Sequence, residues 1–550
     1  MKKLLNWKLV LILVIFLAAF LRVWQLGGAS SNPPSLYWDE VSQGYNAYSV
    51  LTTGFDEHHN FLPITDFVAF GDNKAPVNIY LIVLSIIVLG KTALAIRFPS
   101  ALLGTLTVIC AFYLTREVFW QHKKRDIIAL VAAGLLAVSP WHILLSRASY
   151  EANIATFFTV LGLFLFFFAK RRFAWAYLLS SISFVIGFYA FNSNRVFIPL
   201  IVLVLALLYW RDLLLKKKIV FLSIIIGLVM LLPMVVYFVN PDSRIRFSEV
   251  NIFSDTTVVD QSNTWLKEDN NSLAGKIFDN RRIGYFMLYA KHYFDFYNPQ
   301  YLFFTGDVNP RFSAQASGEL WLWELPFILI GFYMLLKMKN KTALFILLWF
   351  LLAPVAAATA RETPHALRSE TYIPVYELLA ALGLVASGIY LYGKRKLFFY
   401  GTIFVVGAVA LFEGVYFLHE YFVTYPVTYE QEWQYGYAQA IQKTENLQNN
   451  YDLVLFTNYY GRAYIYYLFY ANVSPQTYWK EGNPTADVFG LYNVTKIGKY
   501  EFGDHLLESS DTGKRVLYVL SPKDNLTNLH IIDKVNFLNG NPAFFIGTKK

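Results

Sequence analysis

The sequence predicts a polytopic α-helical membrane protein with a small α/β domain at its C-terminal end. Of its 550 residues, 56% are hydrophobic and only 15% are charged, whereas soluble domains carry about 25% charged residues. Apolar runs long enough to cross a bilayer recur along most of the chain. After residue 418 they give way to short strand-like runs that alternate with helical ones. We therefore expect a membrane domain over residues 1–418 and a second domain over residues 419–550.

Basic segments between the apolar runs predict the orientation of the chain, because such segments are typical of cytoplasmic loops. They are 121–126, 170–172, 211–218, 337–341 and 393–396. The predicted spans are about eleven: 8–26, 98–116, 127–144, 153–169, 174–191, 196–210, 219–238, 321–336, 343–358, 372–392 and 398–418. In this arrangement the N-terminus lies in the cytoplasm and the C-terminal domain lies outside the plasma membrane. The net charge of +9 then reflects these loops and not a nucleic-acid partner.

One apolar run, residues 77–90, does not fit this path. It is short for a crossing, which needs about 20 residues. If it crossed, the basic segment 121–126 would fall on the outer side. We therefore expect an interfacial or re-entrant helix within a long first exterior loop, residues 27–97. A second long exterior loop covers residues 239–320.

The predicted C-terminal domain has the pattern of a small α/β fold. The runs "YDLVLFTN" (451–458) and "KRVLYVLS" (514–521) read as strands, and residues 430–445 read as a helix. The chain has a single cysteine, Cys110, in an apolar run. An intramolecular disulfide and a cysteine-based zinc site are therefore excluded.

Most of the distinctive polar residues fall on the exterior side of this topology, whereas the spans contain few ionisable residues apart from Arg22 and Glu413. A transporter is expected to carry charges near the middle of the bilayer. It commonly shows an internal repeat as well, and we find none. The exterior residues are Asp39, Glu40, Asp56, Glu57, Lys74, Arg147, Glu151, Arg195, Asp307, Arg311, His365 and Arg368. This one-sided distribution favours a reaction centre over a transport path.

A reaction on the exterior side has no access to nucleotide-activated substrates, so the donor is expected to be carried by a lipid. A carboxylate can act as the general base that takes the proton of an acceptor hydroxyl. In an inverting transfer the base and the leaving group lie on opposite faces of the sugar. A phosphate leaving group needs positive charge, which Lys74 and the arginines can supply.

Several stretches resemble the GT-C glycosyltransferases that use polyprenyl-phosphate sugars. The nearest groups are the protein O-mannosyltransferases and the aminoarabinose transferases of lipid A. The first loop resembles theirs in "YWDEVSQGYNAYSVLTTGFDEHHNFLPI", "GDNKAPVNIYL" and "AIRFPSALLG". Further similar stretches are "SPWHILLSRASYEAN", "NSNRVFIPL", "GDVNPRFS", "GELWLWELPFILIG" and "ETPHALRS". The resemblance covers roughly residues 8–420.

The resemblance implies roles for individual residues. Asp39 matches the catalytic acid of the first loop, and Glu40 is the second acid of that pair, expected to orient acceptor groups. Lys74 matches a lysine that contacts the donor phosphate, although "KAPV" departs from the usual Lys-Pro-Pro-Leu. The remaining expected site residues are Arg195 and Arg368 at the donor phosphate, with Arg147, Glu151, His365, Asp56 and Glu57 around the substrate cavity.

Some of these residues also have simpler interpretations. Arg147 and Arg195 can cap the exterior ends of spans, and Lys74 can be an interface lysine. The run "DEHH" (56–59) looks like a metal site, but four consecutive side chains cannot easily converge on one ion. We expect local loop structure there and no metal.

The sequence thus predicts a membrane glycosyltransferase with the GT-C fold. It moves one sugar, as a hexosyl- or pentosyltransferase similar to mannosyltransferases, from a polyprenyl-phosphate carrier to a hydroxyl of a protein, lipid or glycan. No cofactor is expected. Two alternatives stay open: an oligosaccharyltransferase or ligase that uses a diphosphate-linked donor and a divalent metal, and an exporter of lipid or polysaccharide.

Overall fold

The computed structural model describes residues 7–28, 30–70, 72–239, 251–486, 492–503 and 513–549. Residues 240–250 of the predicted second exterior loop therefore lie outside the described part. Each of the predicted spans coincides with a helix. These helices are α1 (Trp7–Val23), α4 (Ala93–Val118), α5 (Arg125–Val138) with α6 (Pro140–Arg147), α7 (Glu151–Arg171), α8 (Ala176–Ala190), α9 (Asn194–Leu215), α10 (Lys217–Val239), α15 (Leu325–Met338), α16 (Lys341–Ala357), α17 (Val375–Lys394) and α18 (Lys396–His419).

The predicted number of spans is not confirmed. Within the described residues, six helices are long and apolar enough to cross a membrane, and α5 with α6 makes a seventh if this bent pair is one span. Others, such as α8 and α16, are apolar but shorter. The chain is a multi-pass membrane protein by these helices, but length and composition do not establish the eleven crossings.

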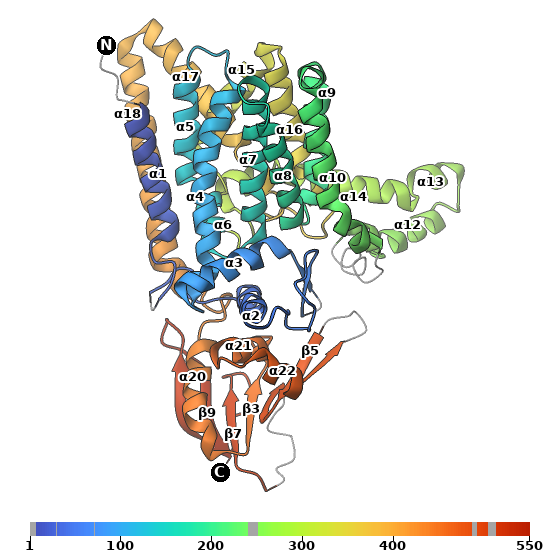
Figure 1. Cartoon of the computed structure of the whole chain (residues 1–550), viewed down its shortest axis with the longest axis vertical. Helices are drawn as coiled ribbons and strands as arrows, with labels where there is room; N and C mark the ends of the chain where they lie inside the picture. Colours follow the sequence, from blue (N-terminus) through green and yellow to red (C-terminus); the bar gives the residue numbers. More distant parts are fainter. Residues whose placement is uncertain are drawn as a thin grey trace. The chain divides into compact units, whose positions relative to one another are not determined.

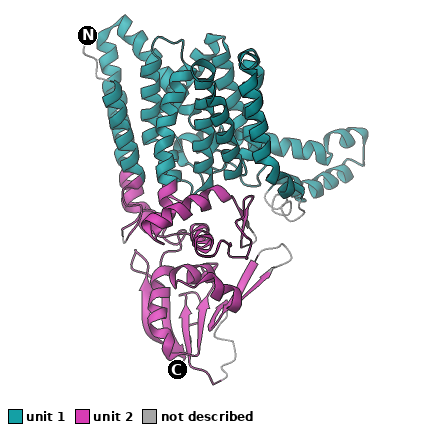
Figure 2. Ribbon diagram, in the orientation of Figure 1, with its two compact units in different colours: residues 1–22, 100–146, 150–417 teal, residues 23–99, 147–149, 418–550 magenta. Residues whose placement is uncertain are grey.

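The chain folds into two compact units (Figure 2). Unit 1 comprises residues 1–22, 100–146 and 150–417, and unit 2 comprises 23–99, 147–149 and 418–550. The sequence analysis grouped the first exterior loop with the spans. In the structure this loop folds together with the residues after 417.

Unit 1 is a bundle of apolar helices (Figure 1). Helices α15 and α17 approach each other at two glycines, because a Cβ on Gly331 would lie 1.9 Å from the carbonyl oxygen of Leu379, and one on Gly383 would lie 1.9 Å from that of Phe327. Small residues at a helix crossing let two backbones pack closely, which is a common device in membrane bundles. Any larger residue at these positions would push the two helices apart.

The bend between α5 and α6 is stabilised by a buried arginine. The two helices meet at 55° across Ser139, just before Pro140. Arg22 of α1 donates hydrogen bonds to the carbonyl oxygens of Leu136 (3.1 Å) and Ala137 (3.0 Å) at the end of α5. The break therefore leaves these carbonyls with partners although the helix does not continue.

Unit 1 also carries an arm of three shorter helices, which projects sideways from the bundle in Figure 1. They are α12 (Thr257–Glu268), α13 (Leu273–Phe278) and α14 (Arg281–Asp295). Polar side chains cap two of them: Ser272 accepts from the backbone N–H of Gly275, and Asn280 accepts from that of Arg282. These caps explain why α13 and α14 begin where they do.

The first loop supplies the helices α2 (Trp38–Thr53) and α3 (Pro76–Leu89), and the hairpin of β1 (Phe67–Ala69) and β2 (Asp72–Lys74), to unit 2. The predicted short helix over residues 77–90 is thus α3. Its Ile79, Ile82 and Ile86 lie in the core of unit 2, whereas Leu84, Ile87 and Val88 are exposed.

The C-terminal part of unit 2 is an α/β fold, as predicted. Its sheet has seven strands in the order β4-β5-β6-β3-β7-β9-β8, and β3 pairs in parallel with both β6 and β7. The two strands expected from the sequence are β3 (Leu453–Thr457) and β7 (Val516–Leu520), which lie side by side. The other elements are β4 (Gly482–Ala486), β5 (Tyr492–Ile497), β6 (Tyr500–Gly503), β8 (Leu529–Asn536), β9 (Pro542–Lys549), α19 (Tyr425–Thr428), α20 (Tyr437–Leu447), α21 (Ala463–Tyr470) and α22 (Pro475–Glu481).

The first loop and the C-terminal part share one hydrophobic core. Val41 and Tyr45 of α2 are buried in the same cluster as Ile465 and Phe469 of α21. The Tyr466 hydroxyl donates to the carbonyl of Leu36 (3.3 Å), and the Trp479 indole N–H donates to that of Glu57 (3.0 Å). The residues after 417 therefore hold the predicted catalytic loop in place.

Candidate active site

The acids Asp39 and Glu40 lie in the first turn of α2, where the helix begins after an extended segment. The Glu40 carboxylate accepts a hydrogen bond from the backbone N–H of Tyr37 (3.3 Å), the residue that precedes the helix. Acidic residues are favourable at this position because the helix dipole and the free N–H groups are positive there. Consecutive residues on a helix point in different directions, so the two acids meet different partners.

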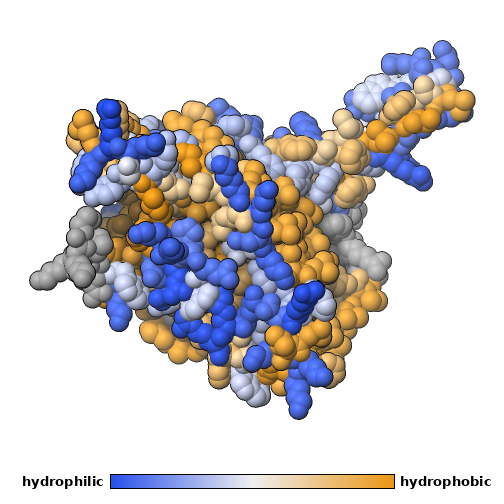
Figure 3. Space-filling model, turned by 90° about the horizontal axis from the view of Figure 1, so that it is seen from above, coloured by the Kyte–Doolittle hydropathy of each residue, from blue (hydrophilic) through white to orange (hydrophobic). Residues whose placement is uncertain are grey.

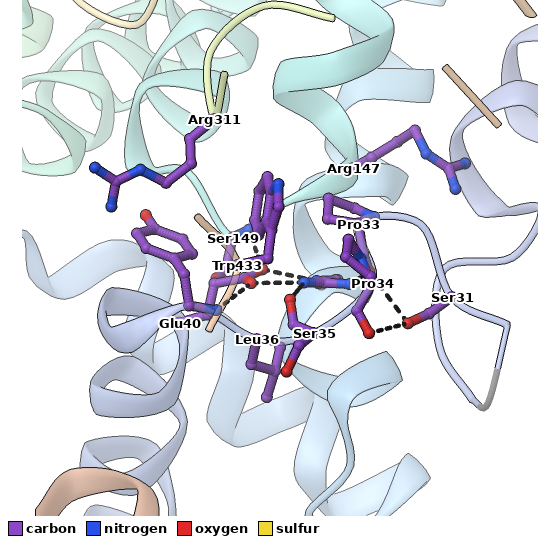
Figure 4. Close-up of polar contacts among 12 residues, drawn as sticks. Ser31, Pro33, Pro34, Ser35, Leu36, Glu40, Arg147, Ser149, Arg311 and Trp433 are labelled. Atoms are coloured by element: carbon purple, nitrogen blue, oxygen red, sulfur yellow. Dashed lines mark hydrogen bonds and ion pairs between the residues drawn. The ribbon is translucent and has the colours of Figure 1, made fainter. Parts of the chain in front are cut away.

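Glu40 is completely buried, and its carboxylate accepts several hydrogen bonds (Figure 4). It receives two hydrogen bonds from the Arg97 guanidinium, at 2.8 Å from Nε and 2.7 Å from Nη2, and one from the backbone N–H of Ser149 (3.0 Å). A buried carboxylate in a bidentate pair with arginine is held in one geometry. This arrangement favours a role for Glu40 in positioning the start of α2 over the expected role of orienting acceptor groups.

Arg97, near the start of α4, organises the segment before α2. Its guanidinium also donates to the carbonyl oxygens of Pro33 (2.7 Å) and Ser35, and it lies 5.7 Å from the centre of the Trp433 ring. A charged residue inside an apolar run needs such partners. The sequence analysis did not single out Arg97, although its position in the apolar stretch "AIRFPSALLG" was a usable signal.

Asp39 is the accessible acid of the pair. Its Oδ1 atom lies 2.6 Å from Nζ of Lys74, and its side chain is 25% exposed. Lys74 ends β2, and the hairpin register places it opposite Phe67 of β1. The structure thus brings together the predicted base and the predicted phosphate-binding lysine in one ion pair.

A buried polar network holds α2 against α3. Asn78 of α3 donates to Oε1 of Gln43 and to Oγ of Ser149, both at 2.9 Å, and the Ser149 hydroxyl donates to the same Gln43 oxygen at 2.8 Å. Every member of this network is buried. These hydrogen bonds tie α2, the helix that carries Asp39, to α3 and to Ser149.

Arg147 is buried in unit 2 and binds backbone. It donates to the carbonyl oxygens of Trp24 (2.6 Å), Gln25 (3.3 Å) and Asn32 (2.6 Å), and its guanidinium lies 4.8 Å from the centre of the Phe422 ring. These contacts favour a structural role over the expected place in a substrate cavity.

The run Asp56–Glu57–His58–His59 forms loop structure. Asp56 accepts hydrogen bonds from the backbone N–H groups of His58 (2.9 Å) and Asn60 (2.8 Å). Glu57 points elsewhere and accepts from the Asn46 side chain at 3.0 Å. In the described part of the chain, no group of three His, Cys, Asp or Glu side chains is arranged to hold a metal ion.

Burial of Glu57 predicts a pH-dependent stability. Burial raises the pKa of this carboxyl from 4.5 to about 8, because the charged form loses its hydration. Above pH 4.5 the unfolded chain ionises Glu57 while the folded chain keeps it protonated. The free energy of unfolding therefore falls as the pH rises from 4.5 to about 8, by up to about 1.4 kcal/mol per pH unit.

Thermal unfolding of the detergent-solubilised protein across this pH range measures the effect. The matched variant is Glu57→Gln, which keeps the shape and cannot ionise, so its midpoint should fall less steeply than that of the wild type. Equal slopes for the two proteins would contradict this account of Glu57.

A second polar cluster lies in unit 1. Asp307 accepts from the backbone N–H groups of Ala366 (2.7 Å) and Asn309 (2.9 Å), and its Oδ2 lies 3.6 Å from Nδ1 of His365. Burial raises the pKa of Asp307 to about 6. Burial, together with Arg368 and Arg311, lowers the pKa of His365 to about 3. The imidazole is therefore neutral at pH 7, and its ring packs on Phe312 with 4.6 Å between the ring centres.

The remaining predicted residues of unit 1 lie at helix starts. Glu151 begins α7, and Arg195 lies in the first turn of α9 with its guanidinium 4.7 Å from the centre of the Tyr237 ring. The sequence analysis also missed the buried Glu319, which accepts from the backbone N–H of Asp307 at 2.9 Å. Its pKa is raised by burial, and Asp307 adds to the rise. The role of Arg195 and Arg368 at a donor phosphate stays a prediction.

A family model described as dolichyl-phosphate-mannose-protein mannosyltransferase matches residues 73–237. "Putative mannosyltransferase YkcB" of Bacillus subtilis strain 168 is 26% identical over 219 residues, which is 38% of this chain. The match spans only 28% of the length of that relative.

Two solved structures cover a larger part of the chain. ArnT from Cupriavidus metallidurans bound to undecaprenyl phosphate matches with a TM-score of 0.53 at 11% identity, covering 98% of both chains. The Archaeoglobus fulgidus oligosaccharyltransferase gives a TM-score of 0.47 at 17% identity, covering 81% of this chain and 58% of that one. The likeness to ArnT shows the fold: the chain has the GT-C fold, and the expected resemblance to GT-C glycosyltransferases is confirmed.

Proposed function

We propose that the protein is a membrane glycosyltransferase that moves one sugar from a polyprenyl-phosphate carrier to a hydroxyl group. The observation that carries this proposal is the ion pair between the partly exposed Asp39 and the buried Lys74, at 2.6 Å, on a scaffold fixed by the buried Glu40–Arg97 pair. The GT-C fold and the match to a family that is named for dolichyl-phosphate-mannose support the choice of donor. A mannosyl donor is the first to test.

In the proposed reaction Asp39 is the general base. The acceptor hydroxyl oxygen attacks the anomeric carbon of the sugar and forms the new glycosidic bond. The bond from that carbon to the phosphate oxygen breaks, and its electron pair leaves with the phosphate. The hydroxyl proton passes to the Asp39 carboxylate, which later returns it to water. Attack on the face opposite the phosphate inverts the configuration at the anomeric carbon.

Lys74 provides the positive charge for the leaving phosphate. A lysine ammonium is a compact charge on a flexible stem, so it can bind a carboxylate and a phosphate in turn. In the proposed cycle the donor phosphate draws Lys74 towards itself. Asp39 then loses its ion-pair partner, so its carboxylate can accept the hydroxyl proton when the substrate is present.

The reaction is proposed to occur on the extracytoplasmic side. The basic segments between the helices support this orientation, since they are expected in the cytoplasm. The acceptor is then a hydroxyl of a protein, lipid or glycan outside the plasma membrane, and the N-terminus of the chain is cytoplasmic.

A transfer assay with the purified full-length protein tests the proposal. The protein is reconstituted in vesicles with a polyprenyl-phosphate sugar, first mannose, then pentose and hexosamine donors, and a mixture of hydroxyl acceptors. We expect the release of one molecule of polyprenyl phosphate for each sugar that is transferred. Transport of intact donor across the vesicle membrane without release of polyprenyl phosphate would instead indicate an exporter.

Metal dependence separates this proposal from an oligosaccharyltransferase-type reaction. The steps above use a carboxylate and a lysine, so EDTA should leave the transfer rate unchanged. Loss of activity in EDTA that manganese restores, with a diphosphate-linked donor as the preferred substrate, would overturn the proposal.

A further inference from the structure

Helix α14 of the arm has two opposite faces, and one of them packs on the bundle. The hydroxyl groups of Tyr289 and Tyr293 donate to the backbone carbonyls of Val355 (3.1 Å) and Leu351 (2.8 Å) of α16. Tyr297, two residues after α14, donates to that of Phe350 (3.1 Å). The His292 ring adds a hydrogen bond of 2.9 Å to the carbonyl of Ala360, just beyond α16. The arm is thus attached firmly to α16.

These contacts fix the level of α14 along an apolar helix of the bundle. Helix α16 ends at Ala357, and Leu351 lies about 9 Å before this end at 1.5 Å per residue. Amphipathic helices that lie in a membrane interface bury their apolar face to a depth of roughly 5–10 Å. Contact with the last turns of an apolar bundle helix therefore supports a position of α14 near the membrane interface.

The other face of α14 is apolar and exposed. Ile283, Phe286, Met287 and Phe294 follow the spacing of one helix face, and Phe286 and Phe294 are 64% and 67% exposed. Helix α13 of the same arm also exposes Leu273, Ile277 and Phe278. In Figure 3 the projecting arm carries orange residues beside blue ones. Large apolar side chains exposed together on a helix face favour an interaction site.

Most of the charges beside this surface are basic, although Asp269, just after α12, is exposed and Asp279, between α13 and α14, is half-buried. The exposed charged residues of α13 and α14 are Lys276, Arg281, Arg282 and Lys291. Asp295, at the end of α14, is half-buried and accepts a hydrogen bond from Thr363 at 2.8 Å. Exposed cations beside an apolar helix face complement the acidic headgroups of a bilayer.

We propose that α13 and α14 form a membrane-docking surface that lies in the interface of an anionic phospholipid bilayer. The side chains of Leu273, Ile277, Phe286, Met287 and Phe294 enter the acyl region. Lys276, Arg281, Arg282 and Lys291 bind acidic headgroups. This surface binds the lipids of the surrounding bilayer and takes no part in sugar transfer.

The single native cysteine makes a clean test possible. In a Cys110→Ser background, Met287→Cys is labelled with an environment-sensitive fluorophore, and the full-length protein is placed in nanodiscs. The matched control is Gln261→Cys, an exposed polar position of α12 in the same arm. In discs of phosphatidylcholine with phosphatidylglycerol, we expect blue-shifted emission at position 287 and quenching by nitroxide lipids several-fold stronger than at position 261.

A second variant tests the charges. We expect nitroxide lipids to quench the label at position 287 more strongly in discs with phosphatidylglycerol than in discs of phosphatidylcholine alone. With Lys276, Arg281, Arg282 and Lys291 all replaced by Gln, this extra quenching should be lost. Retention of that extra quenching would overturn the choice of an anionic headgroup. A label at position 287 that aqueous iodide quenches as strongly as at position 261 would overturn docking itself. A label shielded from both iodide and nitroxide lipids would show that protein covers the surface, which also overturns the proposal.

Discussion

Replacing Asp39 by Asn is expected to abolish sugar transfer while the protein stays folded and binds its donor lipid. The amide keeps the size of the side chain but cannot accept the proton of the acceptor hydroxyl. Loss of a general base lowers rates by about 10²- to 10⁴-fold. Because Asp39 is 25% exposed, in contrast to the buried Glu40 beside it, the substitution leaves the core of unit 2 intact.

Single-turnover transfer from a labelled polyprenyl-phosphate sugar measures this effect, and equilibrium binding of the same lipid measures whether the donor site survives. The matched control is Glu501→Gln, which removes a carboxylate from an exposed ion pair with Lys496 in the same unit. That variant should transfer sugar at the wild-type rate. An Asp39→Asn protein that turns over at a rate within a few-fold of the wild type would exclude Asp39 as the base.

Replacing Glu40 by Gln is expected to destabilise unit 2 severely. The substitution leaves the Arg97 guanidinium completely buried without its counter-charge. Breaking one side of a buried ion pair costs about 3–5 kcal/mol, whereas an exposed pair contributes about 0–1 kcal/mol. Glu40→Gln should therefore lower the thermal unfolding midpoint strongly, and the Glu501→Gln control should not.

The same variant distinguishes a positioning role from a catalytic one. Any Glu40→Gln protein that folds at low temperature should bind donor lipid more weakly and transfer sugar slowly. The reason is that the ion pair between residue 40 and Arg97, which holds the start of α2 against the segment 33–35, is lost. A protein with wild-type stability and donor affinity but no turnover would show that Glu40 takes part in the chemistry.

Local patterns in the sequence predicted the helices of the spans, one short helix of the first loop and two strands. The spans, the short helix over residues 77–90 and the strands β3 and β7 all follow from hydrophobic runs and their periodicity. The number of crossings did not follow, because several helices are shorter than a bilayer is thick. The helix expected over residues 430–445 starts only at Tyr437, after Gly436 in a left-handed conformation.

The candidate site was predictable as a set of residue types but not as an arrangement. The first loop contained both Asp39 and Lys74, and their order suggested one site. Glu40 is buried and Asp39 is partly exposed because Glu40 binds Arg97 and Ser149, which lie 57 and 109 positions away from it in the sequence. Hydrophobic periodicity carries no information about such distant pairs. The carbonyl contacts of Arg147 were hidden for the same reason.

The shared core of the first loop and the last residues ties the folding of the protein to the order of its synthesis. Leu36 is bound by Tyr466, 430 positions later in the chain, and a ribosome adds about 5–20 residues per second. The loop that carries Asp39 therefore waits roughly 20 to 90 s after it leaves the ribosome before its partners exist. Until then a nascent chain can insert its helices into the membrane, but the first loop lacks the C-terminal residues that pack against it. Only a chain translated through its final strands completes the scaffold under α2, so a prematurely released chain carries Asp39 in an unfinished setting.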